Sequence, residues 1–172
     1  VSSRPRRDFV RLQNHLVAAT DFYGEAAPTK VEPSTRVHET AWISPRGVTI
    51  GPGSVVEPRA VLFSGTSVGA RCTVRAGAVL GSVGFQILRD GDDLVDVSHA
   101  GGVLLEDDVH VMAGAVVAAA VFRQRTTIGA SSRIGNLAFV SHNVRTGRRC
   151  IVGHGAVVNG NVILGDDVWI GP

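Results

Sequence analysis

Aliphatic residues recur at every sixth position along the C-terminal part of the chain. Between Ile128 and Pro172, Ile, Val or Leu opens each block of six, with Thr146 as the exception. Gly often follows the opener, and Ser, Ala, Cys or Val occupies the fifth position. This period differs from the 3.6 residues of a helix and from the simple alternation of a strand. It is typical of a parallel β-helix, in which short strands alternate with corners.

The same register extends back through most of the chain. It starts near Val37 and Ile43, has one extra residue before Ile50, and is regular from there up to Leu80. It fails over residues 85–102, where Asp90-Gly91 favours the tight turn of a small hairpin that projects from the column. A second, shorter break falls at residues 121–127. Because loops on rigid scaffolds often carry binding functions, the first break is of particular interest.

The period also predicts the core. Openers and fifth residues are expected to point inward, and a composition of 44% apolar but only 5% aromatic residues fits a narrow aliphatic interior. Cys72 and Cys150 both stand at fifth positions, so we expect buried structural thiols rather than a nucleophile or a disulfide. Counting blocks predicts about six to seven coils.

The chain before the repeat carries a helical pattern over residues 2–24. Ser3 can cap this helix, and its apolar stripe is expected to comprise Phe9, Leu12, Leu16 and Val17. The helix also carries four arginines, which we expect to form a solvated face or, alternatively, to bind an acidic partner: Arg4, Arg6, Arg7 and Arg11. Residues 1–36 are therefore predicted to form a helix and linker, and residues 37–172 the β-helix. The chain stops within a block at Pro172, so we expect a truncated C-terminal end.

Charge and hydropathy limit the partners. Net charge is +2 and Lys30 is the only lysine, which argues against a polylysine arm for nucleic acid. The longest apolar run, residues 113–122, is too short to span a bilayer, and no secretory signal is visible. A cytoplasmic protein is the expectation.

His142 is the candidate for chemistry. It stands third in its block, at a corner, with Asn143 after it and Asn136 at the equivalent position one block earlier. A neutral imidazole can take a proton from an attacking amine or hydroxyl. A corner histidine can equally be an ordinary surface residue, and the spacing alone leaves both interpretations open.

Four motifs resemble a known family in their order and approximate spacing. They are Gly81-Ser-Val-Gly-Phe85, Gly101-Gly-Val-Leu-Leu-Glu-Asp-Asp-Val-His110, Ile134-Gly-Asn136 and Val140-Ser-His-Asn-Val-Arg-Thr-Gly147. The family that they resemble is the UDP-3-O-acylglucosamine N-acyltransferases of lipid A biosynthesis. The resemblance covers residues 37–172 and implies a left-handed β-helix, which makes the expected fold all-β. It also implies a homotrimer whose active sites lie between adjacent columns.

The resemblance further implies roles for individual residues. His142 matches the general base that deprotonates a sugar amine for attack on an acyl thioester, carried by acyl carrier protein or coenzyme A as a cosubstrate. No permanently bound cofactor is implied. Asn136 and Asn143 would orient the substrate or the base, and Phe85 would lie on a loop near the groove.

Other candidates come from the residues themselves. His154 is expected on a different face from His142, lining a groove or simply exposed, and His99 and His110 flank the extruded loop. Phosphate binding and ordinary solvated corners are competing interpretations for Arg123, Arg125, Arg133, Arg145, Arg148 and Arg149. We include His154 and Arg145 among the substrate-binding candidates. No metal is expected, because the closely spaced histidine pair of β-helical zinc enzymes is missing.

Two alternatives to amine acylation of a nucleotide sugar stay open. The segment before the column is shorter than the family's uridine-binding domain, and Ala118-Ala119-Ala120 replaces an Asp-Arg pair. An acetyl-CoA-dependent sugar O- or N-acetyltransferase would need no apolar groove for a long acyl chain. A non-catalytic trimeric scaffold would lose nothing when His142 is replaced by Ala.

Overall fold

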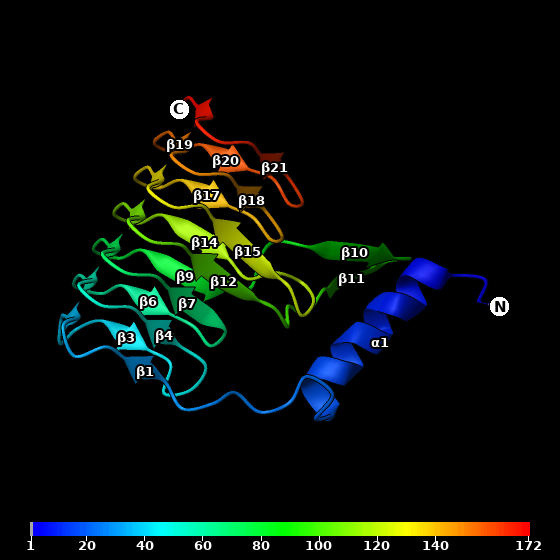
Figure 1. Cartoon of the computed structure of the whole chain (residues 1–172). Helices are drawn as coiled ribbons and strands as arrows, with labels where there is room; N and C mark the ends of the chain where they lie inside the picture. The colour runs from blue at the N-terminus through cyan, green and yellow to red at the C-terminus, as the bar shows by residue number, and fades with distance from the viewer. Residues whose placement is uncertain (1) are drawn as a thin grey trace.

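A computed structural model describes residues 2–172, which form a three-sided column with a helix at its side (Figure 1). Helix α1 (Pro5–Ala19) packs beside a hairpin of β10 (Ile87–Asp90) and β11 (Asp93–Asp96). The remaining strands form three parallel sheets. The predicted parallel β-helix with an N-terminal helix and an extruded hairpin is confirmed.

The chain visits the three sheets in turn, one short strand in each per coil. Sheet 1 consists of β1 (Lys30–Val31), β4 (Thr49–Ile50), β7 (Thr66–Val68), β12 (Gly102–Leu105), β15 (Arg125–Ile128), β18 (Arg145–Thr146) and β21 (Ile163–Leu164). Sheet 2 consists of β2 (Arg36–Val37), β5 (Val55–Val56), β8 (Thr73–Val74), β13 (His110–Val111), β16 (Arg133–Ile134), β19 (Ile151–Val152) and β22 (Trp169–Ile170). Sheet 3 consists of β3 (Trp42–Ile43), β6 (Val61–Leu62), β9 (Val79–Ser82), β14 (Val116–Ala118), β17 (Phe139–Val140) and β20 (Val157–Val158).

The core lies along the axis of the column. Openers such as Leu80, Ile128 and Ile134 are fully buried, and so are the fifth residues Cys72 and Cys150. Both cysteines are free thiols, as predicted. Burial raises the pKa of Cys72 to about 11, against backbone N–H groups that lower it. A thiol with such a pKa is a poor nucleophile near neutral pH.

The column begins earlier than the repeat indicates. Strand β1, in the stretch expected to be linker, pairs in parallel with β4 through Lys30 and Thr49. This first coil escapes the six-residue pattern because its outer residues are exposed and it has no opener as regular as those that follow.

The helix differs from its prediction in extent and orientation. It covers Pro5–Ala19 rather than residues 2–24, and no side chain, including that of Ser3, caps its N-terminus at Arg4. Its buried residues are Val10 and Gln13, whereas the predicted stripe is largely exposed. The prediction of the buried face was wrong because the helix docks through hydrogen bonds to backbone groups of the hairpin and the adjoining loops.

These hydrogen bonds come from two amide side chains. Gln13 Nε2 donates to the carbonyls of Ser98 and Val121, at 3.3 and 3.2 Å. Asn14 Nδ2 donates to the Asp96 carbonyl at 2.8 Å, and Asn14 Oδ1 accepts from the Ser98 N–H. Two of the arginines expected on a solvated face, Arg4 and Arg11, remain largely exposed and also form ion pairs with Asp90 at the tip of the hairpin. No helix among residues 2–172 is long and apolar enough to cross a membrane.

Candidate functional site

The corner between sheets 3 and 1, here called the 3/1 corner, carries the irregular segments of the column. The hairpin leaves between β9 and β12, and the shorter break lies between β14 and β15. A register shift between Val117 and Ala118 marks the exit of that second segment. His142 lies at the same corner one coil further on, between β17 and β18. The extruded loop and the candidate base therefore share one edge.

Hydrogen bonds fix the protonation of the His142 ring. Asn143 Oδ1 lies 3.2 Å from His142 Nδ1 and 3.1 Å from the backbone nitrogen of Val121. Because a backbone N–H can only donate, the atom facing it must be the amide oxygen of Asn143. His142 Nδ1 must then carry the proton that this oxygen accepts. The neutral ring is left with Nε2 as its proton acceptor, as a general base requires.

Asn143 is itself held from three directions. Its backbone N–H donates to Thr126 Oγ1 at 3.0 Å, and its Nδ2 donates to Gln124 Oε1 at 2.6 Å. Its φ of +60° lies in the left-handed region, which Asn tolerates better than most residues. The corner thus orients the histidine through its neighbour.

Gly160 lies one coil above His142 and leaves room for its ring. A Cβ at this position would be 2.4 Å from His142 Cε1 and 2.5 Å from Nε2. No side chain larger than that of glycine fits here unless the imidazole moves. With 9% of its surface exposed, His142 is otherwise nearly enclosed.

His99 packs edge-on against His142, with ring centroids 5.6 Å apart. Its Nδ1 lies 2.9 Å from the Val97 carbonyl and must donate to it, which leaves Nε2 unprotonated in the neutral ring. Burial lowers the pKa of His99, the charge of His142 lowers it further, and the Val97 bond partly opposes both. His99 is thus a neutral neighbour of the candidate base at physiological pH.

A cleft of about 300 Å³ opens beside His142. The other residues that line it are Gln86, Val121, Phe122, Gln124, Asn143 and Asn161. Among residues 2–172, two buried side-chain acceptors lack a hydrogen-bond partner, and both are close to His142: Gln86 Oε1 and His99 Nε2. Gln86 thus lines this cleft while its Oε1 is buried without a hydrogen-bond partner.

The structure brings only some of the predicted site residues together. His142 and Asn143 share the cleft, and Phe85, 83% exposed, follows Gly84 on the adjoining loop. A Cβ at Gly84 would lie 3.0 Å from His99 Nε2 and 3.7 Å from His142 Cδ2, so this loop touches both rings. Arg145 is exposed on β18, which follows the same corner.

Asn136 and His154 lie elsewhere, at the corner between sheets 2 and 3, here called the 2/3 corner. Asn136 donates its N–H to His154 Nδ1 at 3.1 Å, and its Oδ1 accepts from the Ala113 N–H. Within one column these two residues stand across sheet 3 from His142. The expectation that His154 occupies a different face from His142 agrees with this placement.

Several residues of the cleft escaped the sequence prediction. Gln124 and Gly160 stand one coil below and one coil above the His142 corner. Stepping along the chain by one coil from the candidate base could have identified both. Gln86 and the contact made by His99 lie in the first irregular segment, which is too long for a step of one coil to place them, and Phe122 is not one coil away from His142.

Half of the arginines near His142 have structural partners. Arg123 Nη2 donates to the Phe22 carbonyl, and Arg133 Nη1 to three carbonyls that include that of Asp108. Arg149 pairs with Asp167 on the next coil. The hydrogen bonds and ion pair of these three arginines give them a structural role. Phosphate binding stays a hypothesis for Arg125, Arg145 and Arg148.

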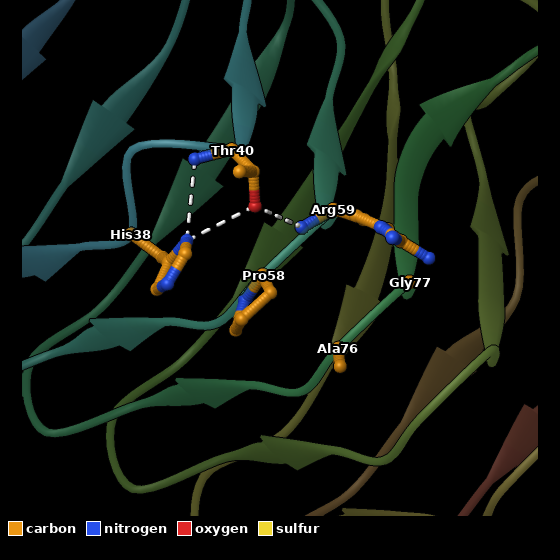
Figure 2. Close-up of a pocket in the computed structure, with 6 residues that line it drawn as sticks. All are labelled: His38, Thr40, Pro58, Arg59, Ala76 and Gly77. Carbon is orange, nitrogen blue, oxygen red and sulfur yellow. Dashed lines mark hydrogen bonds between the residues drawn. The ribbon is translucent and has the colours of Figure 1, made fainter.

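A larger hollow of about 480 Å³ lies at the 2/3 corner in the N-terminal coils (Figure 2). Its polar groups bond to one another: the Thr40 N–H donates to His38 Nδ1, and Thr40 Oγ1 accepts from the Arg59 N–H. It is open and far along the column from His142, so we do not assign chemistry to it. Among residues 2–172 no group of three or more His, Cys, Asp or Glu side chains is arranged to hold a metal ion.

The column and its corners define a class, the parallel β-helix proteins built from hexapeptides. Two solved structures share this fold at low identity. A UDP-N-acetylglucosamine acyltransferase from Campylobacter jejuni matches 81% of this chain and 57% of its own, with 21% identity and a TM-score of 0.64. A UDP-N-acetylglucosamine acyltransferase from Arabidopsis matches 84% and 58%, with 15% identity and a TM-score of 0.58.

Comparison with curated sequences gives more similar relatives, which share one enzyme name. A UDP-3-O-acylglucosamine N-acyltransferase from Caulobacter sp. (strain K31) is 39% identical over 104 residues, which are 60% of this chain and 30% of the relative. UDP-3-O-acylglucosamine N-acyltransferase 1 from Gloeobacter violaceus is 39% identical over 92 residues, or 54% of this chain and 26% of the relative. The chain thus spans less than a third of the length of these two relatives. No family model matches. The resemblance inferred from the motifs is confirmed by these relatives.

Proposed function

We propose that this protein is an acyltransferase that moves an acyl group from a thioester to the amine of a nucleotide-activated amino sugar. The observation that carries the proposal is the fixed tautomer of His142, which leaves Nε2 as the proton acceptor of a ring that lines a cleft. The similarity to UDP-3-O-acylglucosamine N-acyltransferases supports the same chemistry.

The reaction uses the histidine twice. The amine nitrogen attacks the thioester carbonyl carbon while His142 Nε2 takes a proton from the amine. The new C–N bond forms, the C–S bond breaks, and the imidazolium returns its proton to the departing sulfur. Asn143 keeps the ring oriented throughout, because its oxygen accepts from Nδ1 in both protonation states. The donor is acyl carrier protein or coenzyme A carrying the acyl group, consumed as a cosubstrate.

A threefold assembly would complete the site. The outward residues of sheet 3 form an apolar ladder in continuous register, made of Trp42, Val61, Val79, Val116, Phe139 and Val157. Sheets 1 and 2 carry cationic residues at equivalent positions, such as Lys30, Arg36 and Arg145. An apolar face of this length favours burial against other copies.

Packing through sheet 3 would also unite the separated candidates. That sheet is flanked by the 3/1 corner on one side and the 2/3 corner on the other. Three columns that turn sheet 3 toward a common axis would set the 3/1 corner of one beside the 2/3 corner of the next. His142 of one copy would then face Asn136 and His154 of its neighbour across a groove.

The test is a thioester assay with detection of the released thiol. Acetyl-CoA and a long-chain acyl carrier are offered with a panel of UDP- and dTDP-amino sugars. Release should require both donor and amino sugar, and His142→Ala should lower it by about 100-fold, as expected for loss of a general base. His38→Ala, at the exposed 2/3 corner, is the matched control and should retain full activity.

The outcome separates the candidates. If an amino sugar causes thiol release from acetyl-CoA but not from the long-chain acyl carrier, the result would favour the sugar acetyltransferase. The small cleft beside His142 has room for an acetyl group. Thiol release that persists in His142→Ala would remove the histidine from the mechanism. Absence of release with every pair would favour a non-catalytic scaffold.

A further inference from the structure

An apolar strip connects the cleft beside His142 to helix α1. Phe122 lines that cleft, and the ring of Phe9 packs edge-on against it with centroids 5.6 Å apart. Leu12 and Leu16 follow Phe9 at helical spacings of three and four residues, so they continue the same line along α1. We call Phe122, Phe9, Leu12 and Leu16 the α1 strip.

The strip is unusually open for a helix that is already docked. Phe9 is 55% exposed, Leu12 53% and Phe122 36%, while Leu16 is half-buried. The adjoining side of α1 is the docked side, through Val10 and the hydrogen bonds of Gln13 and Asn14. Exposed apolar side chains that form a continuous surface next to a cleft mark a binding surface more often than isolated ones do.

We propose that the α1 strip binds the hydrocarbon chain of an acyl donor whose thioester lies beside His142. This inference rests on the proposed acyl transfer and specifies its donor as one with a medium or long chain. The strip from Phe9 to Leu16 is on the order of 10 Å long at the helical rise. That length suits an extended hydrocarbon, whereas an acetyl group would leave it empty. A chain covering the strip would gain the hydrophobic stabilisation that the free protein lacks.

The geometry also sets a direction. Since Phe122 belongs both to the cleft and to the strip, the carbonyl end of the donor lies at His142 and the chain runs outward along α1. The amino sugar then approaches from the remaining side of the cleft, past Gln86 and Asn161.

The experiment measures binding rather than turnover. Decanoyl-CoA and acetyl-CoA are titrated calorimetrically into the full chain without acceptor. Wild type should bind decanoyl-CoA at least about tenfold more tightly, and Phe9→Ser and Leu12→Ser should each remove most of that difference by deleting apolar contact area. Both positions are more than half exposed, so the variants are expected to fold.

A matched control is Leu94→Ser, at an exposed leucine (62%) on β11 that is not part of the strip. It should preserve the preference for decanoyl-CoA. Equal affinity of wild type for the two donors, or an unchanged preference in Phe9→Ser and Leu12→Ser, would overturn the proposal.

Two further readouts identify other occupants. A change in sedimenting mass in Phe9→Ser would assign the strip to contact between copies of the chain, and binding of wild type to phospholipid vesicles that Leu12→Ser abolishes would assign it to a lipid surface. Either result overturns the acyl-chain site. Because donor binding is measured without an acceptor, the two proposals are tested independently. The thiol assay can refute the proposed reaction while calorimetry supports donor binding to the α1 strip, and calorimetry can refute the strip while the thiol assay supports the reaction.

Discussion

The ring of His142 occupies space that exists because Gly160 has no side chain. Gly160 does not have a positive φ, so glycine is required there by the ring and not by the backbone. His142 could be selected as the candidate base from the sequence because its motif resembles a known family, whereas its corner position alone fits an ordinary surface residue equally well. The need for Gly160 could be found only by counting one coil onward, since nothing in its local sequence distinguishes it from other corner glycines.

Replacing Gly160 by Ala should therefore damage activity more than folding. The new methyl group would displace the imidazole, and a misplacement of about 1 Å lowers catalysis by about 100-fold. Measured kcat should fall accordingly, with the thermal midpoint little changed.

Gly165→Ala provides the comparison. Gly165 also lacks a positive φ, and no atom lies within 4 Å of a Cβ built there. It should retain full activity. Equal kcat values for Gly160→Ala and Gly165→Ala would mean that catalysis does not depend on the present position of the His142 ring.

At the scale of elements, α1 shows where sequence patterns stop being informative. Its existence was predictable from the apolar spacing, but the helix is shorter at both ends than the predicted residues 2–24. Its buried face was not, because the surface it meets combines a small apolar cluster with backbone carbonyl and N–H groups, and both lie on irregular segments outside the repeat. The hairpin turn at Asp90-Gly91 was predictable, since Gly91 adopts the positive φ that such a turn requires.

Docking of α1 should depend on Gln13 more than on the ion pairs of Asp90. Gln13 is 4% exposed, donates to two carbonyls and accepts from Tyr23 Oη at 2.6 Å. Gln13→Leu leaves these groups unpaired, at about 1–3 kcal/mol for each buried group. Asp90→Ala should cost less than about 1 kcal/mol, because its arginine partners are largely exposed.

Limited proteolysis measures the difference. Gln13→Leu should expose α1 to cleavage well before the column unfolds, while Asp90→Ala should resemble wild type. The reverse order would show that the arginines hold the helix.

At the scale of the whole molecule, the column itself was largely readable from the sequence, because one period fixes both the core positions and the corners. The exposed faces were not, since the repeat constrains inward residues alone. The three faces differ: sheet 3 is apolar along its whole height, whereas the outward positions of sheets 1 and 2 mix apolar, neutral polar and charged side chains.

This difference predicts which face mediates self-association. Phe139→Glu, in the middle of sheet 3, should convert a trimer at micromolar concentration into monomers, because three charges would be buried at the interface. Sedimentation measures the mass directly. Ile151→Glu, at an outward position of sheet 2, should leave the mass unchanged. A wild type that sediments as a monomer would exclude a site shared between columns.

The placement of both irregular segments at a single corner has a consequence for how the fold can be altered. Strand β12 pairs in parallel with β7 below and β15 above, although the hairpin intervenes between β9 and β12. The length of that intervening segment is thus independent of the pitch of the column. Loops of other sizes could therefore be grafted between residues 83 and 101 without changing the register of the coils, although such a graft would remove the contact that His99 makes with His142. The coils of the column thus keep one geometry, while the segment between β9 and β12 is free to vary in length and composition.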